Sequence, residues 1–204
     1  MSLESYRRSV SDAKHASILK VAFIRFLEDG FSKAAMADIA READVSTATL
    51  YKHFGSKEEL FVAVVTEAAS EVHEDFGTIP ADATAEDFFH KILLDGWTAQ
   101  RKGRVNDLLR VTIAETNSSP ELARLVFETV VGGRYRRVQA VLDQMVGRGL
   151  LKPHDTAFGA RIALGMIKEL FVWPALLDPD FRLPSDALTQ AQEAIDTYLA
   201  SYGA

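Results

Sequence analysis

Two short helical segments joined by a three-residue turn are the feature that most restricts what this chain can fold into. Residues 36–43 and 47–54 each suit a helix, and only Asp44, Val45 and Ser46 separate them. The first segment carries apolar side chains at the spacing of one buried helical stripe, namely Met36, Ile39, Ala40 and Ala43. Two helices joined by so short a turn form a helix-turn-helix, so this motif is predicted here.

The second helix of this motif presents an outward face suited to a nucleic-acid groove. Ser46 can cap its start, and Leu50 and Phe54, four residues apart, turn inward. The side chains left facing outward are Thr47, Ala48, Thr49, Tyr51, Lys52 and His53. Small residues allow close approach to base edges, and hydroxyl, lysine and histidine groups can bind phosphates. An ordinary helical corner remains an alternative on these residues alone.

Composition indicates a globular chain that needs no covalent cross-links. Its 204 residues can bury one or two ordinary cores, and 48% apolar and 25% charged residues match average globular proteins. The absence of cysteine excludes disulfides and fits a reducing compartment. No apolar stretch reaches membrane-span length and no signal peptide is visible. A cytoplasmic protein without a membrane partner is therefore expected.

The net charge of −6 is not spread evenly along the chain. Residues 1–60 hold nine Lys plus Arg and nine Asp plus Glu, whereas residues 61–204 hold fourteen against twenty. The acidity therefore belongs to the later part. A neutral segment with a local positive surface can still bind a phosphate backbone, with an affinity that falls as salt rises.

The remaining pattern predicts helices throughout. Residues 1–12 are polar and are expected to form a mobile arm, and a helix over 12–28 should end at Gly30. A helix starting at Ser56 should follow the motif. Further helices are expected over 85–101, 105–116, from Pro120 toward 148 with a bend at Gly132 and Gly133, 155–176 and 185–201. We therefore predict an all-α chain of about nine helices, with a three-helix domain over 1–56 and a helical domain over 57–204.

Residues 15–60 closely resemble the amino-terminal domain of the tetracycline-repressor (TetR) family of bacterial transcriptional regulators. The matching residues are Ile18, Leu19, Ala22, Phe26, Gly30, Phe31, Ile39, Ala40, Val45, Ser46, Leu50, Tyr51, Phe54, Ser56, Lys57, Glu58 and Leu60. The chain departs from the family in two places. Ala34 and Ala35 stand where Thr or Ser usually caps the second helix, and Asp44 replaces the turn glycine.

The resemblance implies a set of DNA contacts. Tyr51, His53 and Lys57 would hold phosphates, and Thr47, Ala48 and Thr49 would lie nearest the bases, with Lys14 adding a backbone contact. The full set of expected DNA-binding residues is Lys14, Ala35, Ser46, Thr47, Ala48, Thr49, Tyr51, Lys52, His53 and Lys57. The implied partner is a palindromic double-stranded operator.

The resemblance also implies a ligand pocket and a dimer interface in the second domain. Candidate pocket residues are Phe88, Phe89, Ile92, Trp97, Phe127, Tyr135, Met145 and Met166, which would suit a hydrophobic or aromatic effector. For each of them taken singly, a place in a plain core is the better interpretation. Candidate homodimer contacts are Ile162, Gly165, Met166, Glu169, Leu170, Trp173, Leu188, Ala191, Ile195 and Tyr198. The pattern of these helices alone would equally suit an internal core.

Signatures of enzymes are lacking. The sequence has no phosphate-binding glycine loop, no His-Glu-x-x-His zinc motif and no Gly-x-Ser-x-Gly nucleophile turn. We therefore expect no enzyme activity, metal or cofactor. The leading hypothesis is a ligand-responsive DNA-binding repressor. The alternative is an all-helical small-molecule binder or enzyme that retains the helix-turn-helix as a remnant.

Overall fold

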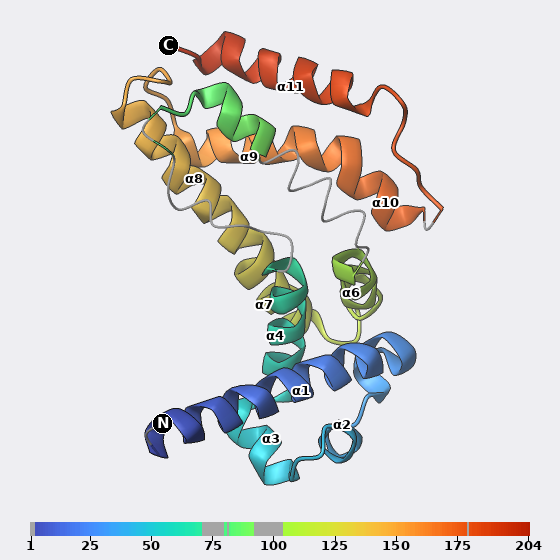
Figure 1. Ribbon diagram of the computed structural model, residues 1–204. Coiled ribbons are helices and arrows are strands. Elements are labelled where there is room, and N and C mark those ends of the chain that lie inside the picture. Colours follow the sequence, from blue (N-terminus) through green and yellow to red (C-terminus); the bar gives the residue numbers. More distant parts are fainter. Residues whose placement is uncertain (1–2, 71–79, 81, 92–103, 179) are drawn as a thin grey trace. The chain divides into compact units, whose positions relative to one another are not determined.

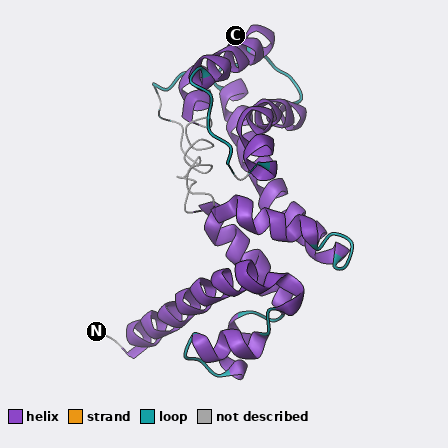
Figure 2. Ribbon diagram, turned by 90° about the vertical axis from the view of Figure 1, so that its right-hand side faces the viewer, coloured by secondary structure: helices purple, strands orange, loops and turns teal. Residues whose placement is uncertain are grey.

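The computed structural model describes residues 3–70, 80, 82–91, 104–178 and 180–204, and these are almost entirely helical (Figures 1 and 2). The helices in chain order are α1 Leu3–Lys33, α2 Met36–Glu42, α3 Thr47–His53, α4 Lys57–Ser70, residues 85–91, α6 Arg104–Ala114, α7 Pro120–Val126, π-helix η1 Phe127–Val131, α8 Gly132–Gly147, α9 Thr156–Ile167, π-helix η2 Lys168–Val172, α10 Trp173–Leu177 and α11 Ala187–Tyr202. Because η1 joins α7 to α8 and η2 joins α9 to α10, the described residues form nine helical stretches, of which α1 is kinked at Gly30. The predicted all-α fold is confirmed.

The chain forms two compact units. Unit 1 comprises Met1–Ala68 and Asp107–Phe127, and unit 2 comprises Ala69–Asn106 and Glu128–Ala204. The boundary expected after residue 56 falls inside unit 1, because α4 buries its apolar stripe there: Leu60, Phe61, Val64, Val65 and Ala68 are at most 6% exposed. Unit 1 therefore contains most of α4, most of α6 and all of α7, besides the three expected helices.

Three phenylalanine rings lie at the centre of unit 1. The ring centroid of Phe26 is 4.9 Å from that of Phe61 and 5.9 Å from that of Phe31, and the Phe31 and Phe61 centroids are 5.4 Å apart. All three are at most 4% exposed. Edge-to-face ring pairs add to the area that such side chains bury. Helix α1 packs on α2, and α2 packs on α3, so this core supports the helix-turn-helix.

Helix α1 is longer than expected at its start and is broken at its predicted end. Residues 3–12 belong to this helix. The prediction of a mobile arm over residues 1–12 is therefore wrong for residues 3–12. The start of the helix was predicted from its apolar stripe, and such a stripe indicates only which part of a helix is buried. A polar segment without proline or glycine can continue the same helix beyond the buried part. Gly30 has φ 74° and ψ 170°, which interrupts the helical path as predicted.

Unit 2 has its own core, formed by α8, α9, α11 and the helical residues 85–91. Its fully buried members include Val138, Leu142 and Met145 of α8 and Ala160 of α9. Helix α11 packs along α9 (Figure 1). None of the helices within the described residues has the length and apolar content needed to cross a membrane.

Gly132 and Gly133, where a bend was expected, directly follow a π-helix. Residues 127–131 adopt the wider turn, and the backbone stays in the right-handed helical region at Val131, so the helix continues into α8. A second π-helix ends at Val172, just before Pro174, and the helix stops at Leu177. Proline has no N–H, so a widened turn is a suitable place for it within a continuing helix.

Candidate nucleic-acid interface

The turn between α2 and α3 is closed by backbone hydrogen bonds around Asp44. The Asp44 N–H donates to the Arg41 carbonyl at 3.3 Å, and the Val45 N–H donates to the Ala40 carbonyl at 3.0 Å. Asp44 has φ 55°, the left-handed conformation that usually requires glycine and that Asp tolerates better than most residues. This pair of bonds is the Schellman arrangement, so the turn keeps its geometry without the family's glycine.

Ser46 caps α3 as predicted. Its Oγ accepts a hydrogen bond from the Thr49 N–H at 3.1 Å and lies 2.8 Å from Thr49 Oγ1. Leu50 is fully buried and Phe54 is 5% exposed, so these two side chains anchor α3 on the unit 1 core. The cap and the anchors together fix the direction in which the remaining side chains of α3 point.

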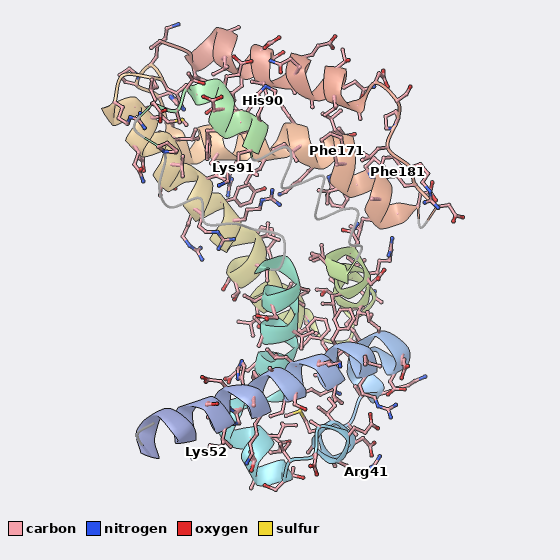
Figure 3. The ribbon with its side chains drawn as sticks, viewed as in Figure 1. Arg41, Lys52, His90, Lys91, Phe171 and Phe181 are labelled. Atoms are coloured by element: carbon pink, nitrogen blue, oxygen red, sulfur yellow. The ribbon has the colours of Figure 1, made fainter. Side chains whose placement is uncertain are left out.

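The outward face of α3 is the one expected from the sequence. Ser46, Thr47, Ala48, Tyr51 and Lys52 are exposed, and Thr49 and His53 are partly exposed. Lys52 of α3 and Arg41 of α2 lie on the same side of unit 1 in Figure 3. Residues 45–57 contain two lysines and no acid, so this surface is neutral to basic. Such a surface can approach a duplex without charge repulsion.

Helix α2 is fixed on α1 by an ion pair between an arginine and a glutamate. Arg25 Nε donates to Glu42 Oε2 at 2.9 Å, and its Nη2 donates to Glu42 Oε1. Hydrogen bonding by Arg25 holds the pKa of Glu42 below its usual range. Ser17 Oγ also donates to the Ala43 carbonyl at 3.3 Å. These contacts hold the end of α2, and so the turn, in one position on α1.

A cluster of rings lies at the carboxyl end of α3. The His15 ring of α1 stacks on Phe54, with centroids 4.8 Å apart, and lies 5.8 Å from the His53 ring. Burial lowers the pKa of His53, and the positive charges of His15, Lys52 and Lys14 lower it further. His15 was missed in the sequence. It precedes Ile18 by three residues and Leu19 by four, which places it on the buried stripe of α1. That spacing could have identified it as part of the packed face.

Lys57, expected to hold a phosphate, is engaged within unit 1. Its Nζ donates to the Ser32 carbonyl at 3.0 Å and lies 4.7 Å from the centre of the Phe31 ring. Partial burial lowers the pKa of Lys57. Ser32 in turn donates through its N–H and Oγ to Glu115, at 3.0 and 2.7 Å. A role of Lys57 in phosphate binding therefore stays a prediction, and its observed contacts are internal.

The ends of α2 and α4 differ in how they are capped. Ala35 is exposed at the start of α2 and gives no side-chain cap, and Ser32 does not replace it because its side chain bonds Glu115. At α4, which starts where predicted, Ser56 Oγ accepts from the Glu59 N–H at 3.1 Å. The Glu59 carboxylate accepts from the Gly55 N–H at 3.0 Å instead of from Ser56. Lys14, the remaining candidate, is exposed on α1.

The Ser46 cap leads to a stability prediction with a matched control. Ser46→Ala removes the bond to the Thr49 N–H and is expected to lower the free energy of unfolding by about 1 kcal/mol. Ser119 occupies the same position at the start of α7 but makes no side-chain cap bond. Ser119→Ala should therefore change little. Urea unfolding of both variants checks this, and equal losses would contradict the assignment of the cap.

The candidate pocket residues occupy different environments. Phe88, Phe89 and Met145 are 6%, 2% and 0% exposed in the core of unit 2, and Tyr135 and Met166 pack against it partly exposed. Phe127 is 58% exposed and belongs to unit 1. Ile92 and Trp97 lie outside the described residues. The buried members therefore lie in the core of unit 2, and ligand binding by any of the eight candidates stays a prediction.

The candidate dimer residues fall into a buried group and an exposed group. Ala191, Ile195 and Tyr198 are 4%, 3% and 2% exposed within the core of unit 2, so the prediction of a surface contact is wrong at these three positions. They pack within the core of their own chain, and the helical spacing could not distinguish such packing from contact with a partner. The exposed candidates are Gly165, Glu169, Trp173 and Leu188, and the partly exposed ones are Ile162, Met166 and Leu170.

Comparison with known proteins agrees with this geometry. Residues 18–64 match the family described as bacterial regulatory proteins, tetR family, and residues 92–204 match the AefR-like transcriptional repressor, C-terminal domain. The HTH-type transcriptional regulator TtgR of Pseudomonas putida is 25% identical over 209 aligned residues, covering 95% of this chain and 94% of TtgR.

Solved structures show the same fold over nearly the whole chain. The Flavonoid-responsive Regulator FrrA aligns with a TM-score of 0.77 and 24% identity, covering 93% of this chain and 97% of FrrA. A TetR family transcriptional regulator from Pseudomonas syringae pv. tomato str. DC3000 aligns with a TM-score of 0.62 and 28% identity, covering 94% and 98%. With the helix-turn-helix and its outward face, these matches establish that the chain is a DNA-binding transcriptional regulator of the TetR family, with an AefR-like C-terminal domain, and not an enzyme.

Proposed function

We propose that this protein is a homodimeric repressor that leaves a palindromic operator when a small molecule binds its C-terminal domain. The observation that carries the proposal is the exposed, acid-free face of α3, which the Ser46 cap and the buried Leu50 hold in a fixed orientation. The match of residues 92–204 to an AefR-like repressor domain supports repression. The name of FrrA, a flavonoid-responsive regulator, is consistent with an aromatic effector.

The proposed contacts follow from the position of each side chain on α3. Thr47, Ala48 and Thr49, in the first turn, are proposed to lie nearest the base edges, because their small size allows close approach. Tyr51, Lys52 and His53, further along, are proposed to bind phosphates. Ser46, Ala35, Lys14 and Lys57 are proposed to lie along the backbone of the duplex at the edges of this surface.

A dimer would place two copies of α3 in successive major grooves, about 34 Å apart along the duplex. The exposed residues Gly165, Glu169, Trp173 and Leu188 are the proposed partner contacts. A ligand that binds more tightly to the dimer arrangement that is not bound to DNA would weaken DNA binding. A coupling free energy of about 1–3 kcal/mol suffices to change the affinity for DNA by about 5- to 150-fold. The protein is proposed to act in the cytoplasm.

A titration against the DNA that flanks its own gene tests this proposal. Fluorescence anisotropy should show specific binding by the wild type. Lys52→Ala should weaken binding to all sequences alike and reduce the slope of log affinity against log salt by about 1. Lys152→Ala, an exposed lysine of unit 2, is the matched control and should change neither quantity. Equal effects of the two substitutions, or no specific binding by the wild type, would contradict the proposal.

The ring cluster at the end of α3 leads to a pH prediction. The pKa of His53 is below its usual value in the free protein, and nearby phosphates favour the imidazolium form, so DNA binding should take up a proton at His53. Operator affinity should therefore rise as the pH falls from about 8 toward about 6, and level off once the free protein is protonated.

Anisotropy titrations across that pH range measure this effect. His53→Gln should flatten the dependence, and His15→Gln should identify any part that comes from the neighbouring ring. His90→Gln, in unit 2, is the control and should leave the dependence intact. An affinity that falls with decreasing pH would show that His53 does not face phosphates in the complex.

A further inference from the structure

Two cations in unit 2 surround the side chain of Tyr135. Lys168 Nζ lies 4.4 Å from the centre of the Tyr135 ring and donates a hydrogen bond to its hydroxyl oxygen. The guanidinium carbon of Arg161 lies 5.8 Å from the same ring centre. Tyr135 comes from α8, Arg161 from α9 and Lys168 from the first residue of η2. We call these three residues the Tyr135 cluster.

The Tyr135 cluster lacks a negative partner among the described residues. No described carboxylate lies within ion-pair distance of Lys168 or Arg161. The residues three and four positions away on their own helix are Ala157, Phe158, Leu164, Gly165, Phe171 and Val172. Other surface cations of this chain, such as Arg110 and Arg124, have an acid at that spacing. Two like charges at one aromatic ring repel each other, so an added anion would relieve the repulsion.

Rare backbone geometry accompanies this cluster. The π-helix η2 begins at Lys168 itself, and η1 ends four residues before Tyr135. Single π-helical turns within α-helices are uncommon and often occur at functional sites. Lys168 and Tyr135 are also partly buried, and Tyr135 packs against the apolar core of unit 2. A ligand at this place would contact apolar groups on one side and cations on the other.

We propose that the Tyr135 cluster recognises the anionic group of the effector, and that the effector is therefore an aromatic organic anion. This inference rests on the proposed function as a ligand-responsive regulator and makes its ligand class specific. Lys168 keeps two N–H donors after its bond to Tyr135, and the Tyr135 hydroxyl can donate its own proton to a carboxylate or sulfonate oxygen. Arg161 adds a delocalised cation, and the phenol ring gives an aromatic ligand a stacking surface.

Two fluorescent probes that share one aromatic body test the inference. 8-Anilinonaphthalene-1-sulfonate carries a sulfonate, and N-phenyl-1-naphthylamine is the same molecule without it. The full-length wild type should bind the sulfonate saturably. Lys168→Met should weaken that binding by about tenfold or more, because a hydrogen bond to a charged group is lost, and should leave the uncharged amine within about twofold. Arg161→Gln should act in the same direction.

The controls separate recognition from a structural role. Lys152→Met, at an exposed lysine of unit 2, should leave both probes unchanged. If the bond from Lys168 to Tyr135 only stabilises the packing of η2 on α8, Lys168→Met will lower the melting temperature while affecting both probes equally. That result would overturn the inference, as would the absence of saturable sulfonate binding by the wild type.

This test is independent of DNA. The probes are titrated without an operator, so failure of the proposed function would appear as loss of specific DNA binding by the wild type, whatever the probes show. In the absence of any probe, Lys168→Met should bind DNA as the wild type does. When both proposals hold, the sulfonate probe should release the wild type from DNA and Lys168→Met should require about tenfold more of it.

Discussion

Ala48→Glu is expected to reduce operator affinity by about 100-fold or more while leaving the protein folded. Ala48 is the second residue of α3 and is exposed, so a longer side chain meets no obstacle in the free protein. A carboxylate in the first turn is favoured by the helix dipole, so stability should be unchanged or slightly higher. In the proposed complex, the same carboxylate would face phosphates at close range, where like charges cost several kcal/mol.

Anisotropy titrations and thermal unfolding together measure this separation of binding from stability. Ala140→Glu, at an exposed alanine of α8 in unit 2, is the matched control and should bind the operator as the wild type does. If Ala48→Glu binds normally, α3 does not enter a groove with this face. A fall in stability that accompanies the loss of binding would instead indicate that the fold had changed.

Phe61→Ala should lower the free energy of unfolding by about 3–5 kcal/mol. Phe61 is fully buried, and its ring contacts Phe26 and Phe31 at centroid distances of 4.9 and 5.4 Å. Truncation would leave a cavity where α4 packs on α1, and α1 carries α2 and, through it, α3. Because natural domains have a total stability of only about 5–15 kcal/mol, DNA binding should fail at moderate temperature.

Chemical denaturation of Phe61→Ala and of a matched variant checks this cost. Phe158 is the same residue type at 57% exposure in α9, so Phe158→Ala should change stability by less than about 1 kcal/mol. A small effect of Phe61→Ala, comparable with that of Phe158→Ala, would be inconsistent with the observed ring packing. Both variants replace phenylalanine by alanine, so the two sites differ in how deeply the ring is buried and not in the chemistry of the substitution.

The helix-turn-helix could be predicted because its signals are local. The Ser46 cap, the left-handed Asp44 and the inward Leu50 each depend on residues within one helical turn, and all three are observed. The outward face of α3 follows directly from those positions. The family resemblance then gave the DNA-binding role that the residues alone left open against a plain helical corner.

Features that depend on long-range packing were not predictable. Ala191, Ile195 and Tyr198 show the same helical spacing whether α11 packs on its own chain or on a partner, and they pack on their own chain. The internal contacts of Lys57 depend on Ser32 and Phe31, which come from the end of α1. The two π-helices likewise have no signature in residue spacing, although Gly132 and Gly133 indicated an irregular helix next to the first of them.

The discontinuous make-up of unit 1 has a consequence for protein engineering. Glu115 binds Ser32, a residue 83 positions earlier, and residues 107–127 belong to the same compact unit as α1 to α4. A chimera that grafts only the first 56 residues onto a relative would break the Phe26–Phe61 contact and leave the Ser32 hydroxyl without its carboxylate acceptor. Swapping operator specificity between regulators of this kind therefore calls for exchanging the two segments together, or for transplanting single side chains of α3 onto an intact recipient.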